Sequence, residues 1–338
     1  MTSDTNTVLL NALVREGVLI DVSIRYWRGT KKLNAEDLGL KAENVCERLI
    51  SLGHKRLFPK ERTATLALIE SRAHAFIEHN TFPFLNGLAH FVPNAKLSEV
   101  TQALNTLEQD FWAAKRRFLD SYGTLRESAI QEWNAIAQRL VPDPQRLLAT
   151  IEASFPPAAT LERSFGFDTQ LFQIAAPERL GLDLVALGDQ EQLIASRNQA
   201  AQAAADKIRQ QSESFIADCV ASLREQTAQL CEEMLQSMQT ATGGVHQKTL
   251  NRLIHFIDQF KQLNFVGDQA MEDQLERVRQ EFLTRSAEDY RNDEHARARL
   301  QHGLRALSNH AHQLAKQDTR ELIERFGQMG QRKFHLVA

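Results

Sequence analysis

The chain has 338 residues, and its 40 Lys and Arg against 43 Asp and Glu give a formal net charge of -3. Hydrophobic residues make up 43% and charged residues 25%, a balance that excludes disordered, collagen-like and supercharged proteins. There is no run of about 18 apolar residues, and the first residues lack the pattern of a signal peptide. We therefore expect a cytoplasmic protein without stable membrane insertion.

Proline and cysteine usage gives two further constraints on the fold. All eight prolines lie at or before Pro177, so the rest of the chain is permissive for long helices. The three cysteines, Cys46, Cys219 and Cys231, form no CxxC pair. This sparse, odd count argues against a disulfide framework and a zinc ribbon, and it fits a reducing cytosol.

The first part of the chain predicts a helix over residues 5–15 followed by three short β segments. Apolar and polar residues alternate over 18–27, which indicates a strand. Asn86-Gly87 between apolar flanks predicts a hairpin over 84–92. A third strand is expected over 169–174. Together these segments predict a small α+β head formed by residues 1–95 and 155–180.

The remaining segments show apolar residues at steps of three and four, which is typical of helices. Residues 96–140 predict one helix within a long body segment, 96–154. Residues 189–240 predict a helix of roughly 75–80 Å, whose apolar positions Ile208, Cys219 and Leu230 are eleven apart. Further helices are expected over 245–264 and 269–326, with a turn at 265–268 and a kinked joint or solvent-bridging helix at 288–299.

The predicted fold class is therefore mainly α. A long antiparallel helical hairpin or coiled-coil body, with residues 181–338 as its larger part, carries the small α+β head. Short connections between long amphipathic helices favour antiparallel neighbours.

No catalytic, cofactor or metal site is predicted. Gly243–Thr249 lacks the second glycine of a phosphate-binding loop, and no strand precedes it. His310 and His312 are two apart on a helix, so they point in different directions. The adjacent acids Glu232 and Glu233 have no recognisable acid–base partner, so we expect a solvated helix face there.

The segment from Arg25 to Arg62 is the most basic part of the chain, with ten basic residues against five acidic ones. Basic and aromatic residues together are typical of nucleic-acid binding, although the whole chain is slightly acidic. An acidic protein partner and an ordinary solvated face are the alternatives. The candidate binding residues are Arg25, Trp27, Arg28, Lys31, Lys32, Lys55, Arg56, Lys60 and Arg62.

The segment 80–94 is rich in aromatic residues for a connection. It is either buried in the head or forms an apolar docking surface. The candidate docking residues are Phe82, Phe84, Leu85 and Phe91.

Three stretches, Val18–Leu40, Glu47–Leu57 and Thr81–Lys96, together resemble an uncharacterised family of unknown function found in bacteria, phages and mobile elements. The resemblance is densest over about residues 15–180. Members of that family occur near genes for MoxR-like or cobalt-chelatase-like AAA+ ATPases and a von Willebrand A protein. The resemblance thus implies a class of partner, and it carries no catalytic residue over to this chain.

The sequence leads to a first functional hypothesis and two alternatives. We expect a non-enzymatic helical scaffold or adaptor that assembles with itself or with an AAA+ ATPase, in a mobile-element or defence-type system. The first alternative is nucleic-acid binding through Arg25–Arg62. The second is a membrane-active helical toxin.

Overall fold

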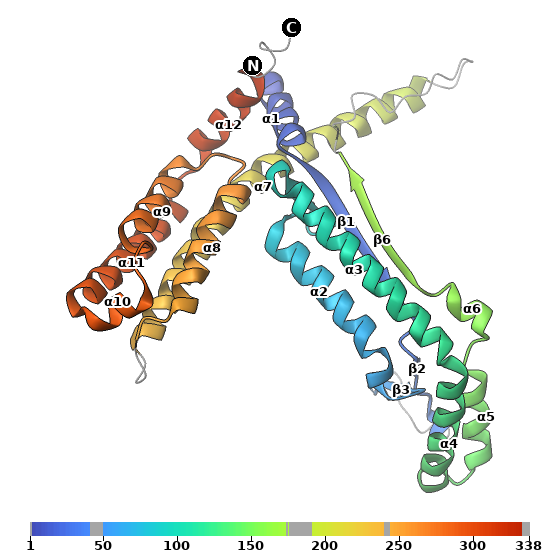
Figure 1. The fold of residues 1–338 in the computed structure, drawn as a ribbon. Coiled ribbons are helices and arrows are strands. Elements are labelled where there is room, and N and C mark those ends of the chain that lie inside the picture. The colour runs from blue at the N-terminus through green and yellow to red at the C-terminus, as the bar shows by residue number, and fades with distance from the viewer. Residues whose placement is uncertain (1, 41–49, 174, 176–190, 240–243, 333–338) are drawn as a thin grey trace. The chain divides into compact units, whose positions relative to one another are not determined.

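The computed structural model describes residues 2–40, 50–173, 175, 191–239 and 244–332 (Figure 1). The chain forms two compact units that interleave along the sequence. Unit 1 comprises Met1–Ile20, Asn80–Ser98 and Leu171–Ala338, and unit 2 comprises Asp21–His79 and Glu99–Gln170. The division into a head and a body that the sequence suggests remains a prediction.

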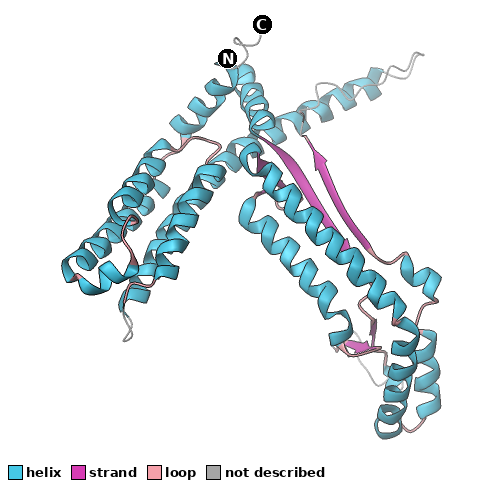
Figure 2. Cartoon of the chain, in the orientation of Figure 1, coloured by secondary structure: helices cyan, strands magenta, loops and turns pink. Residues whose placement is uncertain are grey.

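The described residues are mainly helical, as predicted, with a small antiparallel sheet (Figure 2). No helix among them has the length and apolar character needed to cross a membrane. The α-helices are α1 (Thr2–Glu16), α2 (Ala64–Asn80), α3 (Asn94–Asp120), α4 (Tyr122–Leu140), α5 (Pro144–Ala153), α6 (Ala158–Glu162), α7 (Glu191–Gln239), α8 (Gln247–Leu263), α9 (Gln269–Phe282), α10 (Ala287–Asn292), α11 (Glu294–Ala315) and α12 (Arg320–Arg332).

The three predicted β segments join one four-stranded sheet with the order β4-β5-β1-β6. Its strands are β1 (Gly17–Arg25), β4 (Phe82–Phe84), β5 (Ala89–Pro93) and β6 (Gly166–Phe172). β4 and β5 form the predicted hairpin, in which Phe84 pairs with Ala89. The connecting turn has positive φ at Leu85, Asn86 and Gly87, which Asn and Gly tolerate best. β5 then pairs antiparallel with the first half of β1.

The structure also contains a two-stranded sheet that the sequence did not predict. It consists of β2 (Thr30–Lys32) and β3 (His54–Arg56), which pair antiparallel. Both strands are three residues long and strongly basic, so neither shows the apolar alternation by which strands are recognised.

The core of unit 1 is organised around the apolar stripe of α7. The eleven-residue spacing places Cys219 and Leu230 in this core, as its periodicity predicts. α11, α1, α12 and α8 pack against α7. Near the middle of α7, the Phe215 ring meets Phe84 at 4.7 Å and Phe91 at 5.5 Å between ring centroids. The aromatic residues of the β4–β5 hairpin are thereby fixed to the helical core.

A buried ion pair joins α7 to the turn between α8 and α9. The Arg224 Nε donates to the Asp268 carboxylate at 2.6 Å, and both side chains are at most 6% exposed. Arg224 also donates from Nη1 to the Leu314 carbonyl of α11 at 2.6 Å. Asp268 additionally caps α9 by accepting from the Met271 backbone N–H. One charged pair therefore ties three helical segments together.

The core of unit 2 is aromatic. Trp27 lies 5.2–6.5 Å, between ring centroids, from four surrounding rings. α3 covers β6 through Phe111, whose ring lies 5.7 Å from that of Phe167. The rings around Trp27 are Phe58, Phe118, Tyr122 and Phe155.

Two helix predictions require correction. The single helix expected over 96–140 is two helices, because α3 ends at Asp120 and α4 begins at Tyr122, on either side of Ser121. The helical run expected over 269–326 is divided into four helices, α9 to α12. The stretch 288–299, for which a kinked joint and a solvent-bridging helix were the two alternatives, contains the end of α10 and the start of α11; Ser286 caps α10 and Asp293 caps α11. The two capping side chains therefore mark where α10 and α11 begin.

We expect Asp268→Ala to lower the free energy of unfolding by about 3–5 kcal/mol, because it leaves the Arg224 charge buried without its partner. Urea unfolding followed by circular dichroism measures this change. Glu276→Ala is the matched control, because it removes a carboxylate from an exposed pair with Lys261. An equal loss of stability in both variants would contradict the importance of the buried pair.

Candidate functional site

The predicted basic segment forms the β2–β3 sheet of unit 2 and its surroundings. Lys31 pairs across the ladder with Lys55, and Lys32 pairs with His54. Gly29, which precedes β2, has φ 61° and leaves no room for a Cβ beside the Phe58 ring. Its carbonyl accepts from the Leu57 backbone N–H at 2.7 Å. This close approach fixes the position of the basic strands against the aromatic core.

Lys55 is buried and belongs to the core of unit 2. Its Nζ lies 2.6 Å from the Asp37 carboxylate, and the two side chains are 4% and 5% exposed. Asp37 lies in the short helix η1 (Ala35–Leu38) and also accepts from the Asn34 backbone N–H. This pair offsets the repulsion between Lys55 and Lys31, which stand directly opposite each other. Lys55 therefore holds the sheet in place and is turned away from solvent.

Arg25 and Arg28 are exposed but have acidic partners within the chain. Arg25 contacts Asp168 of β6 at 3.0 Å, and Arg28 contacts Glu70 of α2 at 2.6 Å. Glu70 also accepts from the Tyr26 hydroxyl. Burial, assisted by the Glu70 charge, raises the pKa of Tyr26 above its ordinary value. Arg25 thus connects β1 to β6, and Arg28 connects the segment after β1 to α2.

Trp27 is half-buried within the aromatic cluster of unit 2. A tryptophan that stacks on nucleic-acid bases needs a free ring face. The Trp27 indole instead packs against its four neighbours, so this ring does not provide the aromatic platform that the sequence indicated.

Seven of the candidate cations are exposed, and five of these have no acidic partner within 4 Å among the described residues. Lys32 and Arg56 lie on the same face of the β2–β3 sheet, because their pairing partners are His54 and Thr30, whereas Lys31 lies on the other face, opposite Lys55. The short helix η3 (Lys60–Thr63) continues the basic character, with Glu61 as its one acidic residue. We call this set the basic hairpin surface: Lys31, Lys32, Arg56, Lys60 and Arg62.

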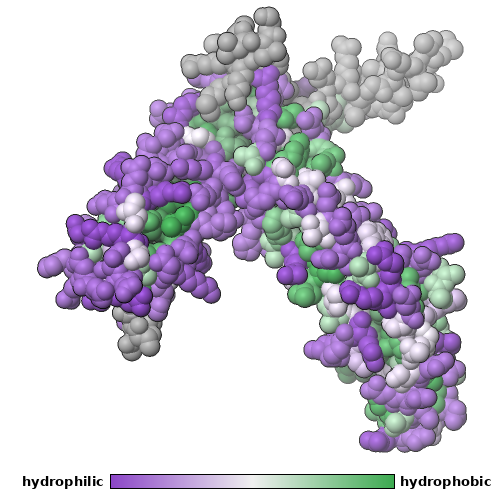
Figure 3. Space-filling model, viewed as in Figure 1, coloured by the Kyte–Doolittle hydropathy of each residue, from purple (hydrophilic) through white to green (hydrophobic). Residues whose placement is uncertain are grey.

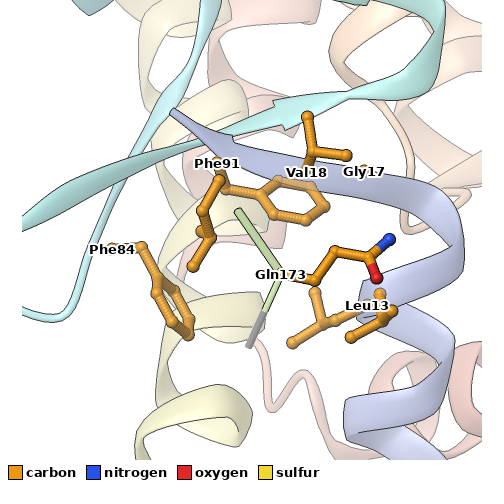
Figure 4. A pocket seen from close by; sticks show the side chains of 8 residues that line it. Leu13, Gly17, Val18, Phe84, Phe91 and Gln173 are labelled. Carbon is orange, nitrogen blue, oxygen red and sulfur yellow. The ribbon is translucent and has the colours of Figure 1, made fainter. Parts of the chain in front are cut away.

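The aromatic residues of the segment 80–94 are buried in unit 1, whereas Leu88 in its turn is 72% exposed. Phe82, Phe84 and Phe91 are 5%, 2% and 3% exposed, and Leu85 is half-buried against the same core. A small hollow remains beside them, lined by Leu13, Gly17, Val18, Phe84, Phe91 and Gln173 among others (Figure 4). Its volume of about 10 Å³ leaves room for about one water molecule. Phe82, Phe84 and Phe91 are therefore part of the core of unit 1, and the hollow beside them is too small to dock a partner.

A polar cluster on the surface of unit 1 was not anticipated from the sequence. Glu232 of α7 accepts from Ser308 at 3.2 Å and bonds to the His312 imidazole at 2.8 Å, both on α11. The hydrogen bonds from His312 and Ser308 lower the pKa of Glu232 below its ordinary value. Ser308 and His312 are four residues apart, so they lie on the same face of a helix, and this spacing is the only indication of the contact in the sequence.

The part of the chain that the structure describes holds no cluster of three or more His, Cys, Asp or Glu residues suited to a metal ion. Its surface is mixed in character: on the face in Figure 3, hydrophilic residues predominate over α8–α11, and hydrophobic residues are interspersed over α2–α5. The exposed large apolar side chains of unit 2 among the described residues are Leu40, Ile50, Leu68, Ile136 and Leu140.

Comparison with known proteins places the chain in a family. The model of DUF3150, a family described as proteins of unknown function, matches residues 14–288. The chain belongs to this family, which is consistent with the resemblance to a family of unknown function seen in its sequence. No curated protein and no solved structure matches the chain.

We expect Lys55→Ala to destabilise unit 2 by about 3–5 kcal/mol, because Asp37 then stays buried without a countercharge. Lys31→Ala, on the opposite strand, is expected to change stability by no more than about 0.5 kcal/mol, since Lys31 is exposed. Thermal and urea unfolding of the two variants measures the difference. Similar behaviour of both lysines would contradict the separation between structural and surface cations.

Proposed function

We propose that this protein is a non-enzymatic scaffold or adaptor, which assembles with itself or with an AAA+ ATPase in a bacterial mobile-element or defence-type system. In this proposal the long helices of the chain form an antiparallel, coiled-coil-like body, and the sheet-containing part provides recognition. The AAA+ class of partner comes from the family resemblance. The basic hairpin surface is the single observation that most supports recognition of an acidic partner.

The argument from this surface is electrostatic. Three of the candidate cations, Arg25, Arg28 and Lys55, have acidic partners within unit 2. The five cations of the basic hairpin surface are exposed, three on strands β2 and β3 and two on helix η3. A buried ion pair and an aromatic core hold the strands in place. Clustered charge of one sign steers an oppositely charged partner and fixes its orientation. A rigid support lowers the entropy lost when such a partner binds.

Charge reversal tests the adaptor hypothesis. We expect the native chain to co-purify with a MoxR-like AAA+ ATPase. Lys31→Glu/Lys32→Glu/Arg56→Glu is expected to lose at least about tenfold in affinity for it, because attraction becomes repulsion. The matched control is Lys248→Glu/Arg305→Glu/Lys316→Glu, which makes the same change at exposed residues of unit 1. Isothermal titration calorimetry measures both. Equal binding by the two triple variants would contradict a role for the basic hairpin surface.

Nucleic-acid binding is the second candidate function, and the same surface favours it. Because Trp27 is packed in the aromatic cluster, contact would come from cations and phosphates, without base stacking. We expect the affinity for single-stranded DNA or RNA to fall with salt, and Lys31→Ala/Lys32→Ala/Arg56→Ala to reduce the log–log slope by about 2. Fluorescence anisotropy over a salt series measures the slope. Salt-independent binding, or an unchanged slope, would rule out this use of the surface.

A further inference from the structure

The strand β6 forms an open edge of the four-stranded sheet. It stands at the end of the strand order, and no described strand pairs with its outer side. Its last five residues, Asp168–Phe172, are all exposed. Among them, Leu171 is 51% and Phe172 is 41% exposed. An edge of this kind presents unpaired backbone N–H and C=O groups to any strand that can approach it.

The opposite edge of the same sheet has a different character. β4 is only three residues long, and Pro83 at its centre has no N–H to donate. A short strand and a proline are two devices by which proteins block pairing at a sheet edge. β6 has seven residues, with neither proline nor lysine among them. The sheet therefore leaves one of its two edges suited to accept another strand.

We propose that β6 pairs antiparallel with β6 of a second copy of this chain, with Thr169 opposite Thr169 on the two-fold axis. A two-fold interface requires the same patch to complement itself, and antiparallel strands meet this condition about a central residue. This proposal rests on the scaffold function proposed above, which includes self-assembly. It identifies β6 as the surface through which two copies assemble.

The sequence of β6 complements itself in this register. Phe167 stands opposite Leu171 of the second copy, which pairs two apolar side chains on the face that also carries Thr169. Asp168, the one charged residue of the strand, stands opposite Gln170, so no like charges face each other. The exposed Leu171 and Phe172 each gain a neighbour across the new ladder.

In the remaining pair, Gly166 and Phe172 stand opposite each other, and Arg25 of β1 lies beside them. Gly166 stands opposite Phe172 of the second copy, and an aromatic residue across from a glycine shields its bare backbone. The Arg25 guanidinium already lies over Gly166, where it approaches within 2.7 Å of the position of a Cβ. The Phe172 ring of the second copy therefore comes beside a cation, a favourable pairing. Arg25 also stays close to Asp168, which keeps that carboxylate neutralised at the edge.

Sedimentation velocity over a concentration series tests the proposal. The purified full chain is expected to shift from 38.3 kDa toward twice that mass as its concentration rises. Thr169→Lys and Thr169→Glu each place like charges opposite each other on the axis, and each is expected to weaken the dimer about fivefold. An equimolar mixture of the two variants is expected to recover the dimer, because each lysine then faces a glutamate. Thr65→Lys, at an exposed position of α2, is the control and keeps the native affinity.

Each other result overturns the inference. A native chain that stays monomeric at all concentrations shows that β6 does not pair with β6 of a second copy. A dimer that Thr169→Lys does not weaken uses another surface. Loss in both variants without recovery in the mixture rules out the register about Thr169. Failure of the dimer leaves co-purification with the ATPase intact, and that co-purification is tested separately through the basic hairpin surface.

Discussion

The apolar stripe of α7 must be removed from water along a helix of 49 residues, and the arrangement of unit 1 follows from this requirement. α11, α1, α12 and α8 cover the stripe, and the aromatic residues of the β4–β5 hairpin close over Phe215. A charge on the same buried surface is tolerated only with full compensation. Arg224 meets this condition through hydrogen bonds to Asp268 and to the Leu314 carbonyl. The same contacts join α7 to α9 and α11.

Charge compensation organises unit 2 in a similar way. Lys55 is neutralised by Asp37 in the core, and Arg25 and Arg28 are neutralised by Asp168 and Glu70 on the surface. The cations of the basic hairpin surface are those that folding leaves without acidic partners among the described residues. A count of basic residues along the segment therefore overstates the charge that a partner meets. What matters for recognition is the subset that the fold keeps exposed on a fixed support.

The two proposed interaction surfaces rely on different physics. The basic hairpin surface attracts through clustered charge, which salt weakens. The β6 edge offers backbone hydrogen bonds and apolar pairs, which salt affects little. An adaptor needs such independent sites, because occupation of one surface must leave the other available. The proline in β4 and its absence from β6 restrict strand pairing to a single edge of the sheet.

Local periodicity in the sequence was sufficient for α1, α7, α8 and the strands β1, β4, β5 and β6, because amphipathic spacing is a property of neighbouring residues. It did not predict the β2–β3 sheet, whose basic residues carry no apolar alternation, or the interruption at Ser121. It also could not separate Lys55 from Lys31. The Asp37–Lys55 and Arg25–Asp168 partners lie 18 and 143 residues apart, so only the tertiary structure decides which charges are paired and which remain exposed.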